Sequence, residues 1–198
     1  MKHTLQLASL SVATLAALVI SGCAAPSAAP TAAAPKAAPA STAAEPTEAK
    51  EFFSVLKDGR IYAFGDTRNY FDFLAHGEVT LTRTKIGTGP GGATVVYGIT
   101  SADVKANKPS MGERILEAKL PAAPNFHGEV FKDGRFYVFP ELKDMMPFIA
   151  FGEVPYSFTD IGAGPNGETL VWVMNSTSIK TGRPVATMER FKALRAAK

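Results

Sequence analysis

The feature that most constrains the fold is that the chain repeats itself after 75 residues. Residues 55–109 align without a gap with residues 130–184, and 23 of the 55 pairs are identical. The matching stretches include Val55–Phe64 with Val130–Phe139, Gly77–Val79 with Gly152–Val154, and Ile86–Gly92 with Ile161–Gly167. Each copy is one folding unit, and two copies of about 145 residues in total suffice to bury a core. The sequence therefore predicts one compact domain made of two repeats, residues 51–122 and 123–198.

Each repeat opens with the pattern of a tight hairpin. Asp58-Gly59 and Asp133-Gly134 stand between apolar runs, and Asp-Gly favours a two-residue type I′ turn because both positions need positive φ. With that turn, the expected cross-strand pairs are Lys57 with Arg60, Val55 with Tyr62 and Phe53 with Phe64. Both faces of the hairpin are apolar away from the tip, so we expect both to be covered.

A short helix is expected after each hairpin. Asn69 and Asp144 occupy equivalent positions, and each precedes an apolar stretch that ends in a glycine, Gly77 or Gly152. Asparagine and aspartate are favoured N-caps, and glycine is favoured just after a helix, so these residues mark the predicted ends. Pro147 then falls in the first turn, where its missing N–H is tolerated.

The rest of each repeat reads as two more strands and a closing element. In the first copy, residues 79–86 and 94–100 are strand-like and are joined by a glycine-rich loop. Residues 111–118 and 186–193 close the two copies, as a strand or as a short helix. The pattern is ββαββ plus one element, twice. It predicts an α+β, mainly antiparallel domain and not a parallel doubly wound sheet.

The N-terminus has the pattern of an export signal. Met1-Lys2-His3 is a short basic start, and the apolar run Leu5–Ile20 is too short to span a bilayer comfortably, which is typical of a signal peptide. The run ends in Ile20-Ser21-Gly22-Cys23, which resembles the lipobox of bacterial lipoproteins. The resemblance implies a signal peptide of residues 1–22 and attachment of diacylglycerol and palmitate to Cys23. An ordinary secretory signal with an incidental cysteine is the alternative.

The expected lipid places the rest of the chain at a membrane. Buried acyl chains contribute about 0.8 kcal/mol per methylene, so several of them make an effectively permanent anchor. By the sorting rule of that lipoprotein class, Ala24 after the cysteine implies the outer membrane of a host that has one. Cys23 is the only cysteine, so no internal disulfide is expected, and no later stretch reaches transmembrane length.

A linker is expected between Cys23 and the repeats. Residues 24–50 are almost entirely Ala, Pro, Ser and Thr, without the apolar periodicity of a core. Over 27 residues, a linker of this kind reaches roughly 30 Å as a coil or about 80 Å in polyproline II. Without Lys2, the chain has 20 basic and 18 acidic residues, which argues against a nucleic-acid partner.

The hairpin and helix loosely resemble the heavy-metal-associated YHS module, over about 25 residues of each copy. The resemblance is carried by the hairpin pattern at residues 57–64 and 132–139. The cysteines of that module are absent here, so its metal chemistry does not carry over. His76 and His127, at non-equivalent positions, are expected to pack in the core or face solvent. A metal site made only of carboxylates stays open, and no cofactor is predicted.

Two glycine-rich loops match a nucleotide-binding pattern only literally. Residues 87–92 and 162–167 fit G-x-G-x-x-G, but each is followed by a β-branched run and not by a helix. The sequence therefore favours plain hairpin loops over phosphate-binding loops.

Two groups of residues remain as candidate sites. Glu78 and Glu153 each follow a helix-ending glycine, where a carboxylate gains nothing from the helix dipole, so each is a candidate base, ligand contact or structural ion pair. The second group is the hairpin tips. They are either a basic, aromatic contact surface or ordinary solvated turns. The tip residues are Lys57, Arg60, Tyr62, Lys132, Arg135 and Tyr137.

The sequence favours a non-enzymatic binding or structural module for an envelope protein or polymer, anchored in the outer membrane and facing the periplasm or the cell surface. Two alternatives stay open. A binder of a small ligand or cell-wall glycan, using a cleft between the repeats, needs exposed Tyr or Trp on a concave surface. A hydrolase needs Glu78 and Glu153 about 5 to 9 Å apart in one pocket.

Overall fold

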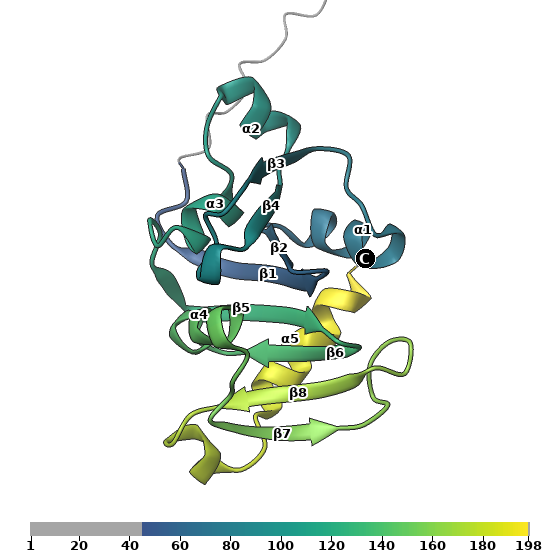
Figure 1. The fold of residues 1–198 in the computed structure, drawn as a ribbon. Helices are drawn as coiled ribbons and strands as arrows, with labels where there is room; N and C mark the ends of the chain where they lie inside the picture. Colours follow the sequence, from purple (N-terminus) through teal and green to yellow (C-terminus); the bar gives the residue numbers. More distant parts are fainter. Residues whose placement is uncertain (1–44, 198) are drawn as a thin grey trace, which may run out of the picture. The chain divides into compact units, whose positions relative to one another are not determined.

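A computed structural model describes residues 45–197, which form one sheet with helices on both faces (Figure 1). The predicted signal, Cys23 and residues 24–44 of the predicted linker lie outside the described residues. In chain order the described elements are β1 (Ala49–Lys57), β2 (Arg60–Phe64), α1 (Thr67–His76), β3 (Thr82–Lys85), η1 (Pro90–Gly92), β4 (Thr94–Gly98), α2 (Ser101–Ala106), α3 (Met111–Leu116), β5 (Ala122–Lys132), β6 (Arg135–Phe139), α4 (Leu142–Phe151), β7 (Tyr156–Asp160), β8 (Thr169–Met174), η2 (Ser178–Thr181) and α5 (Val185–Ala196).

The eight described strands have the order β3-β4-β2-β1-β5-β6-β8-β7. Four of the seven neighbouring pairs are antiparallel, so the prediction of a mixed fold with a mainly antiparallel sheet is confirmed. In the middle of the sheet, β1 and β5 lie side by side and parallel, with Leu56 opposite Lys132. Both hairpin tips therefore project from the same end of the sheet (Figure 1).

Both predicted hairpin turns are confirmed. The φ angles are 53° at Asp58 and 70° at Gly59, and 50° at Asp133 and 71° at Gly134. Aspartate tolerates this left-handed region better than most side chains, and glycine enters it freely. The observed cross-strand pairs include Lys57 with Arg60, Val55 with Tyr62, Phe53 with Phe64 and Lys132 with Arg135.

Both faces of the two opening hairpins are buried away from the tips, as their apolar pattern predicts. Helices α3 and α4 cover one face, and α1 and α5 cover the other. Figure 1 shows α4 in front of the sheet and α5 behind it. The largest buried rings are Phe52, Tyr97, Phe139 and Phe148 on the first face and Phe53, Phe64, Tyr70 and Trp172 on the second. Helices α1 and α4 therefore cover opposite faces, although each follows a hairpin.

The predicted start of the first helix is wrong by three residues. Helix α1 has Asp66 as its N-cap, and the Asp66 carboxylate accepts hydrogen bonds from the backbone N–H of Asn69 at 2.8 Å and from its side-chain amide at 2.9 Å. Asn69 is therefore the third residue of the helix. The predicted end is confirmed, because Gly77 has φ of 79° and its N–H donates to the carbonyl of Phe73.

Helix α4 shows the same displacement. Its N-cap is Glu141, without a side-chain capping bond, so Asp144 lies in the first turn and Pro147 in the second. A proline there removes one intrahelical hydrogen bond, contrary to the expected first-turn position. The predicted C-terminal glycine, Gly152, is confirmed with φ of 78°.

The segments that close the two predicted repeats are helices. Residues 111–116 form α3, and residues 186–193 lie within α5. The glycine-rich loops join β3 to β4 and β7 to β8, which are antiparallel, so they are the hairpin loops that the sequence favours.

Candidate functional site

The two hairpin tips lie next to each other because β1 and β5 pair in parallel. A groove of about 570 Å³ lies between them. The charged residues in its lining are Lys57, Asp58, Arg60, Lys132 and Asp133, and its apolar residues include Leu56, Ile61, Ala93, Phe131 and Ile149. The groove thus has charged rims and an apolar floor, and both predicted repeats contribute to it.

Each tip places two cations directly opposite each other. Lys57 pairs with Arg60 across the first hairpin, and Lys132 pairs with Arg135 across the second. None of the four forms an ion pair with another described residue, whereas eight other Lys or Arg side chains do. Like charges that face each other across an antiparallel pair are destabilising, so this arrangement weakens both hairpins.

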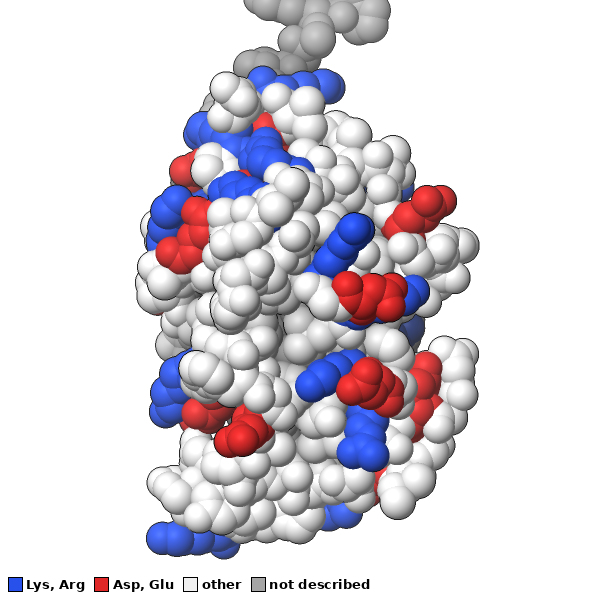
Figure 2. Space-filling model, viewed as in Figure 1, with Lys and Arg blue, Asp and Glu red and all other residues white. Residues whose placement is uncertain are grey.

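The charge at the tips is mixed in sign. Each turn also exposes one aspartate, Asp58 or Asp133, so each tip carries two cations and one anion. On the face drawn in Figure 2, basic and acidic side chains alternate near the ends of β1 and β5 without forming one large patch. The tips therefore offer local cation pairs and not a broad basic surface.

Tyr62 and Tyr137 are not part of an exposed aromatic tip, which corrects the sequence-based expectation. The ring of Tyr62 packs on Phe73 of α1, with centroids 4.5 Å apart, and Tyr137 packs on Phe148 of α4 at 4.3 Å. Because α1 and α4 cover opposite faces, the two tyrosines lie on opposite sides of the sheet. The tips carry charged side chains of both signs and no exposed aromatic ring.

The lysines of the two tips differ in their surroundings. The Nζ atom of Lys132 lies beside Gly152, the C-cap of α4. A Cβ atom added to this glycine would be only 3.1 Å from Nζ. The Lys132 ammonium thus lies at the C-terminal end of α4, where the helix dipole favours positive charge. A Cβ atom on Gly77, the C-cap of α1, would meet no atom within 4 Å, so Lys57 does not lie against its helix in this way.

Glu78 and Glu153 do not share a cleft, which contradicts the paired-carboxylate hydrolase. Both are exposed, and they precede the two outermost strands, β3 and β7. Those strands are seven spacings apart, about 34 Å measured across the sheet, and a glycosidase pair is about 5 to 9 Å apart. Neither glutamate forms an ion pair with another described residue, so the structural ion pair that the sequence also allowed is not observed.

Glu129 is a fully buried carboxylate that was not predicted from the sequence. Arg195 of α5 donates to both of its oxygens, at 2.9 and 2.6 Å. The Tyr70 hydroxyl donates to Oε2 at 3.1 Å, and Nε2 of His127 lies 2.9 Å from Oε1. The Arg195 guanidinium also lies 3.4 Å from the ring centroid of Phe191. These contacts link α1 and α5 to β5 in the centre of the sheet.

The partners of Glu129 keep it ionised. Burial by itself raises the pKa of Glu129, but hydrogen bonds and charges from Arg195 and His127 outweigh it, so the pKa lies below its ordinary value. Burial and the neighbouring negative charge of Glu129 raise the pKa of Tyr70 well above its ordinary value, so Tyr70 remains a neutral donor. Each oxygen of Glu129 has two partners, which fits a structural role.

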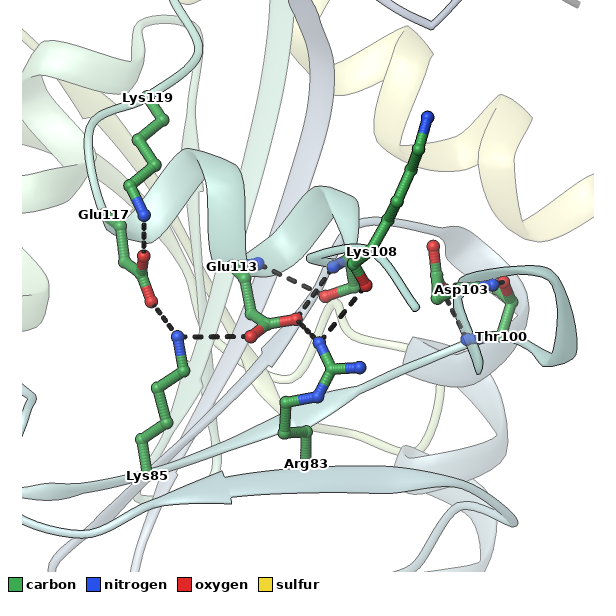
Figure 3. A network of polar contacts seen from close by, with 9 residues as sticks. Arg83, Lys85, Thr100, Asp103, Lys108, Glu113, Glu117 and Lys119 are labelled. Atoms are coloured by element: carbon green, nitrogen blue, oxygen red, sulfur yellow. Dashed lines mark hydrogen bonds and ion pairs between the residues drawn. The ribbon is translucent and has the colours of Figure 1, made fainter. Parts of the chain in front are cut away.

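A second polar network holds the edge strand β3 (Figure 3). Glu113 of α3 is 1% exposed, lies 2.6 Å from Nη1 of Arg83 and 3.2 Å from Nζ of Lys85, and accepts the backbone N–H of Ser110 at 2.7 Å in a capping box. Lys85 also pairs with Glu117. The cations of β3 are therefore neutralised by α3, in contrast to the cations of the hairpin tips.

No protein-family model, curated protein or solved structure matches this chain. No described helix is long and apolar enough to cross a membrane. Within residues 45–197, no group of three or more His, Cys, Asp or Glu side chains could hold a metal ion. The hairpin tips and their groove are therefore the candidate functional site.

Proposed function

We propose that this chain is an outer-membrane lipoprotein anchored through Cys23, and that residues 45–197 form a non-enzymatic module that binds an envelope protein with its paired hairpin tips. The observation that carries the proposal is the position of the tips. Strand β1 runs from Ala49 to Lys57, so the chain enters the sheet about 27 Å from the tips. A tether at one end leaves the tips at the other end free to meet a partner in the periplasm or at the cell surface.

The fold supports an origin in a duplicated ββαββ unit, residues 51–122 and 123–198. The order of two strands, a helix and two strands occurs in residues 49–98 and again in residues 122–174. The strand order is mirrored about the junction of β1 and β5, and both hairpins have the same register. A duplication of this kind places two identical Lys-Asp-Gly-Arg tips side by side.

A protein partner is favoured over a cell-wall glycan by the groove itself. Its lining contains no tyrosine or tryptophan on which a sugar ring could stack, and Trp172 is 1% exposed. The tip end of the sheet also carries Ile86 and Ile161, which are 83% and 87% exposed in the two equivalent hairpin loops. These two isoleucines lie beside β3 and β7, at opposite edges of the sheet, and neither is part of the groove lining, so the argument for a protein partner rests on the groove.

Site-specific photo-crosslinking in living cells tests the binding surface. A photoreactive residue replaces Asp133 at a tip, and a matched control replaces Ser176, which is exposed just after β8 at the opposite end of the sheet. The expected result is an adduct of one defined mass from position 133 and not from position 176. The same adducts from both positions, or none from position 133, would contradict the proposal.

The anchor is tested separately by labelling cells with a radioactive or alkyne-bearing palmitate. The wild-type chain is expected to take up label and to sediment with membranes. The Cys23→Ser variant is expected to lose both properties, whereas Ser21→Ala, two residues away, keeps them. Lipid uptake by Cys23→Ser would show that the anchor lies elsewhere.

A further inference from the structure

The four cations at the hairpin tips are not required by the turns. Asp-Gly alone supplies the two residues with positive φ that a type I′ turn needs. Lys57 with Arg60, and Lys132 with Arg135, add a like-charge pair to each tip, and no described carboxylate forms an ion pair with any of them. A bound anion at each tip would remove this repulsion.

The two cation pairs lie on opposite faces of the sheet. Side chains alternate along a strand, so Lys57 shares the face of Val55, which α1 and α5 cover, and Lys132 shares the face of Val130, which α3 and α4 cover. The centres of the two hairpins are two strand spacings apart, about 10 Å. A ligand that bridges the tips must therefore present two anions about 10 Å apart that point in opposite directions.

An extended peptide has this geometry. Residues i and i+3 of a strand are about 10 Å apart and point to opposite sides. A peptide that crosses the end of the sheet can therefore give one carboxylate to each cation pair, while an apolar side chain between them enters the groove lined by Leu56, Ile61 and Ile149.

We propose that the paired tips bind an extended acidic segment of the partner protein, in which two carboxylates are three residues apart. This inference rests on the proposed function of the tips. Lys57 and Arg60 bind one carboxylate, and Lys132 and Arg135 bind the other. The absence of Tyr and Trp from the groove lining favours such a peptide over an acidic glycan.

The test is fluorescence anisotropy with the purified full-length protein in a non-ionic detergent. The probe is a labelled, end-blocked peptide of sequence Gly-Glu-Leu-Ser-Glu-Gly. The variant Lys57→Gln, Arg60→Gln, Lys132→Gln, Arg135→Gln is expected to bind at least about tenfold more weakly, because each carboxylate loses its charged donors. The control variant removes the same number of positive charges away from the tips, at exposed side chains that form no ion pair with another described residue. It is Lys50→Gln, Arg68→Gln, Lys105→Gln and Lys180→Gln, and it keeps the wild-type affinity.

Three outcomes overturn the inference. The first is equal binding by the tip variant, shown by circular dichroism to be folded, and the wild type. The second is equal binding of a peptide with both glutamates replaced by glutamine, or with the glutamates adjacent. The third is displacement of the peptide by heparin or by phosphatidylglycerol vesicles at lower concentrations than an unlabelled copy requires. If the peptide does not bind but position 133 still crosslinks to one protein, the proposed function stands and only the acidic ligand is wrong.

Discussion

Arg195 in the last helix donates to both carboxylate oxygens of Glu129, 66 residues earlier in the chain, at 2.9 and 2.6 Å. Glu129 is fully buried, and the Arg195 side chain is 16% exposed. The pair joins α5 to β5, next to the junction between the two predicted repeats. It therefore links the C-terminal helix to the strand pairing that brings the hairpin tips together.

Removing one partner of this ion pair should strongly destabilise the domain. Glu129→Gln leaves the Arg195 charge largely buried without its carboxylate, and breaking a buried pair in this way costs about 3 to 5 kcal/mol. The double variant Glu129→Gln, Arg195→Met should recover part of this loss because no buried charge remains unpaired. The free energy of unfolding in urea measures both effects.

The matched control for that experiment is Glu189→Gln. Glu189 is exposed on α5 and forms no ion pair with another described residue, so its replacement should change stability by less than about 0.5 kcal/mol. A loss for Glu129→Gln as small as that of the control would mean that the Glu129 cluster does not stabilise the fold.

The depressed pKa of Glu129 predicts a dependence of stability on pH. The folded-state pKa lies below the ordinary value of 4.5, so Glu129 contributes stability that is present above pH 4.5 and is lost as the pH falls through the folded-state pKa. The free energy of unfolding of the wild type should therefore fall more steeply below pH 4.5 than that of Glu129→Gln. Parallel curves for the two proteins would contradict this assignment.

The parts of the fold that the sequence predicted depend on local chemistry. Asp58-Gly59 and Asp133-Gly134 determine turn type and register within a few residues, and Gly77 and Gly152 end their helices by adopting positive φ. The start of α1 was not predicted because Asp66 and Asn69 are both capping residues, and only the three-dimensional contact shows that Asn69 donates to Asp66. The start of α4 was not predicted because its N-cap, Glu141, makes no side-chain capping bond.

The parts that the sequence could not predict depend on long-range contacts. Nothing local specifies that β1 pairs in parallel with β5, which brings the two tips together. The partners of Glu129 come from α1, β5 and α5. The pattern of residues 111–118 and 186–193 fits a strand as well as a short helix. One sequence signal was available, since Glu129 takes the place of Ser54 between apolar neighbours of a strand that is buried on both faces.

The corrected helix start leads to a prediction for α1. Asp66→Ala removes the side-chain acceptor of the N-cap and should destabilise the protein by about 1 kcal/mol, as N-cap replacements usually do. Asn69→Ala should have a smaller effect because its backbone N–H still donates to Asp66. Urea unfolding of both variants measures the difference, and a larger effect of Asn69→Ala would restore Asn69 as the critical residue.

The like-charge tips predict that stability and binding can be separated. Arg60→Glu places a carboxylate directly opposite Lys57, and Arg135→Glu does the same opposite Lys132, so each replaces a repulsive cross-strand pair by an attractive one. Each substitution should raise the free energy of unfolding by about 0.5 kcal/mol at low salt, within the range of cross-strand charge pairs. The gain should be smaller at 1 M salt, because Lys57, Arg60 and Arg135 are exposed, Lys132 is partly exposed, and salt screens charges in contact with solvent. Arg60→Gln and Arg135→Gln are the controls, since they remove the repulsion without adding attraction and should give a smaller gain.

The same glutamate variants should bind the acidic peptide more weakly than the glutamine variants do. Greater stability together with weaker binding would indicate that the cation pairs are kept for a ligand at the expense of the hairpins. A loss of stability in Arg60→Glu would instead mean that Arg60 already makes a favourable contact in the folded protein, and the argument for a bound anion at that tip would fail.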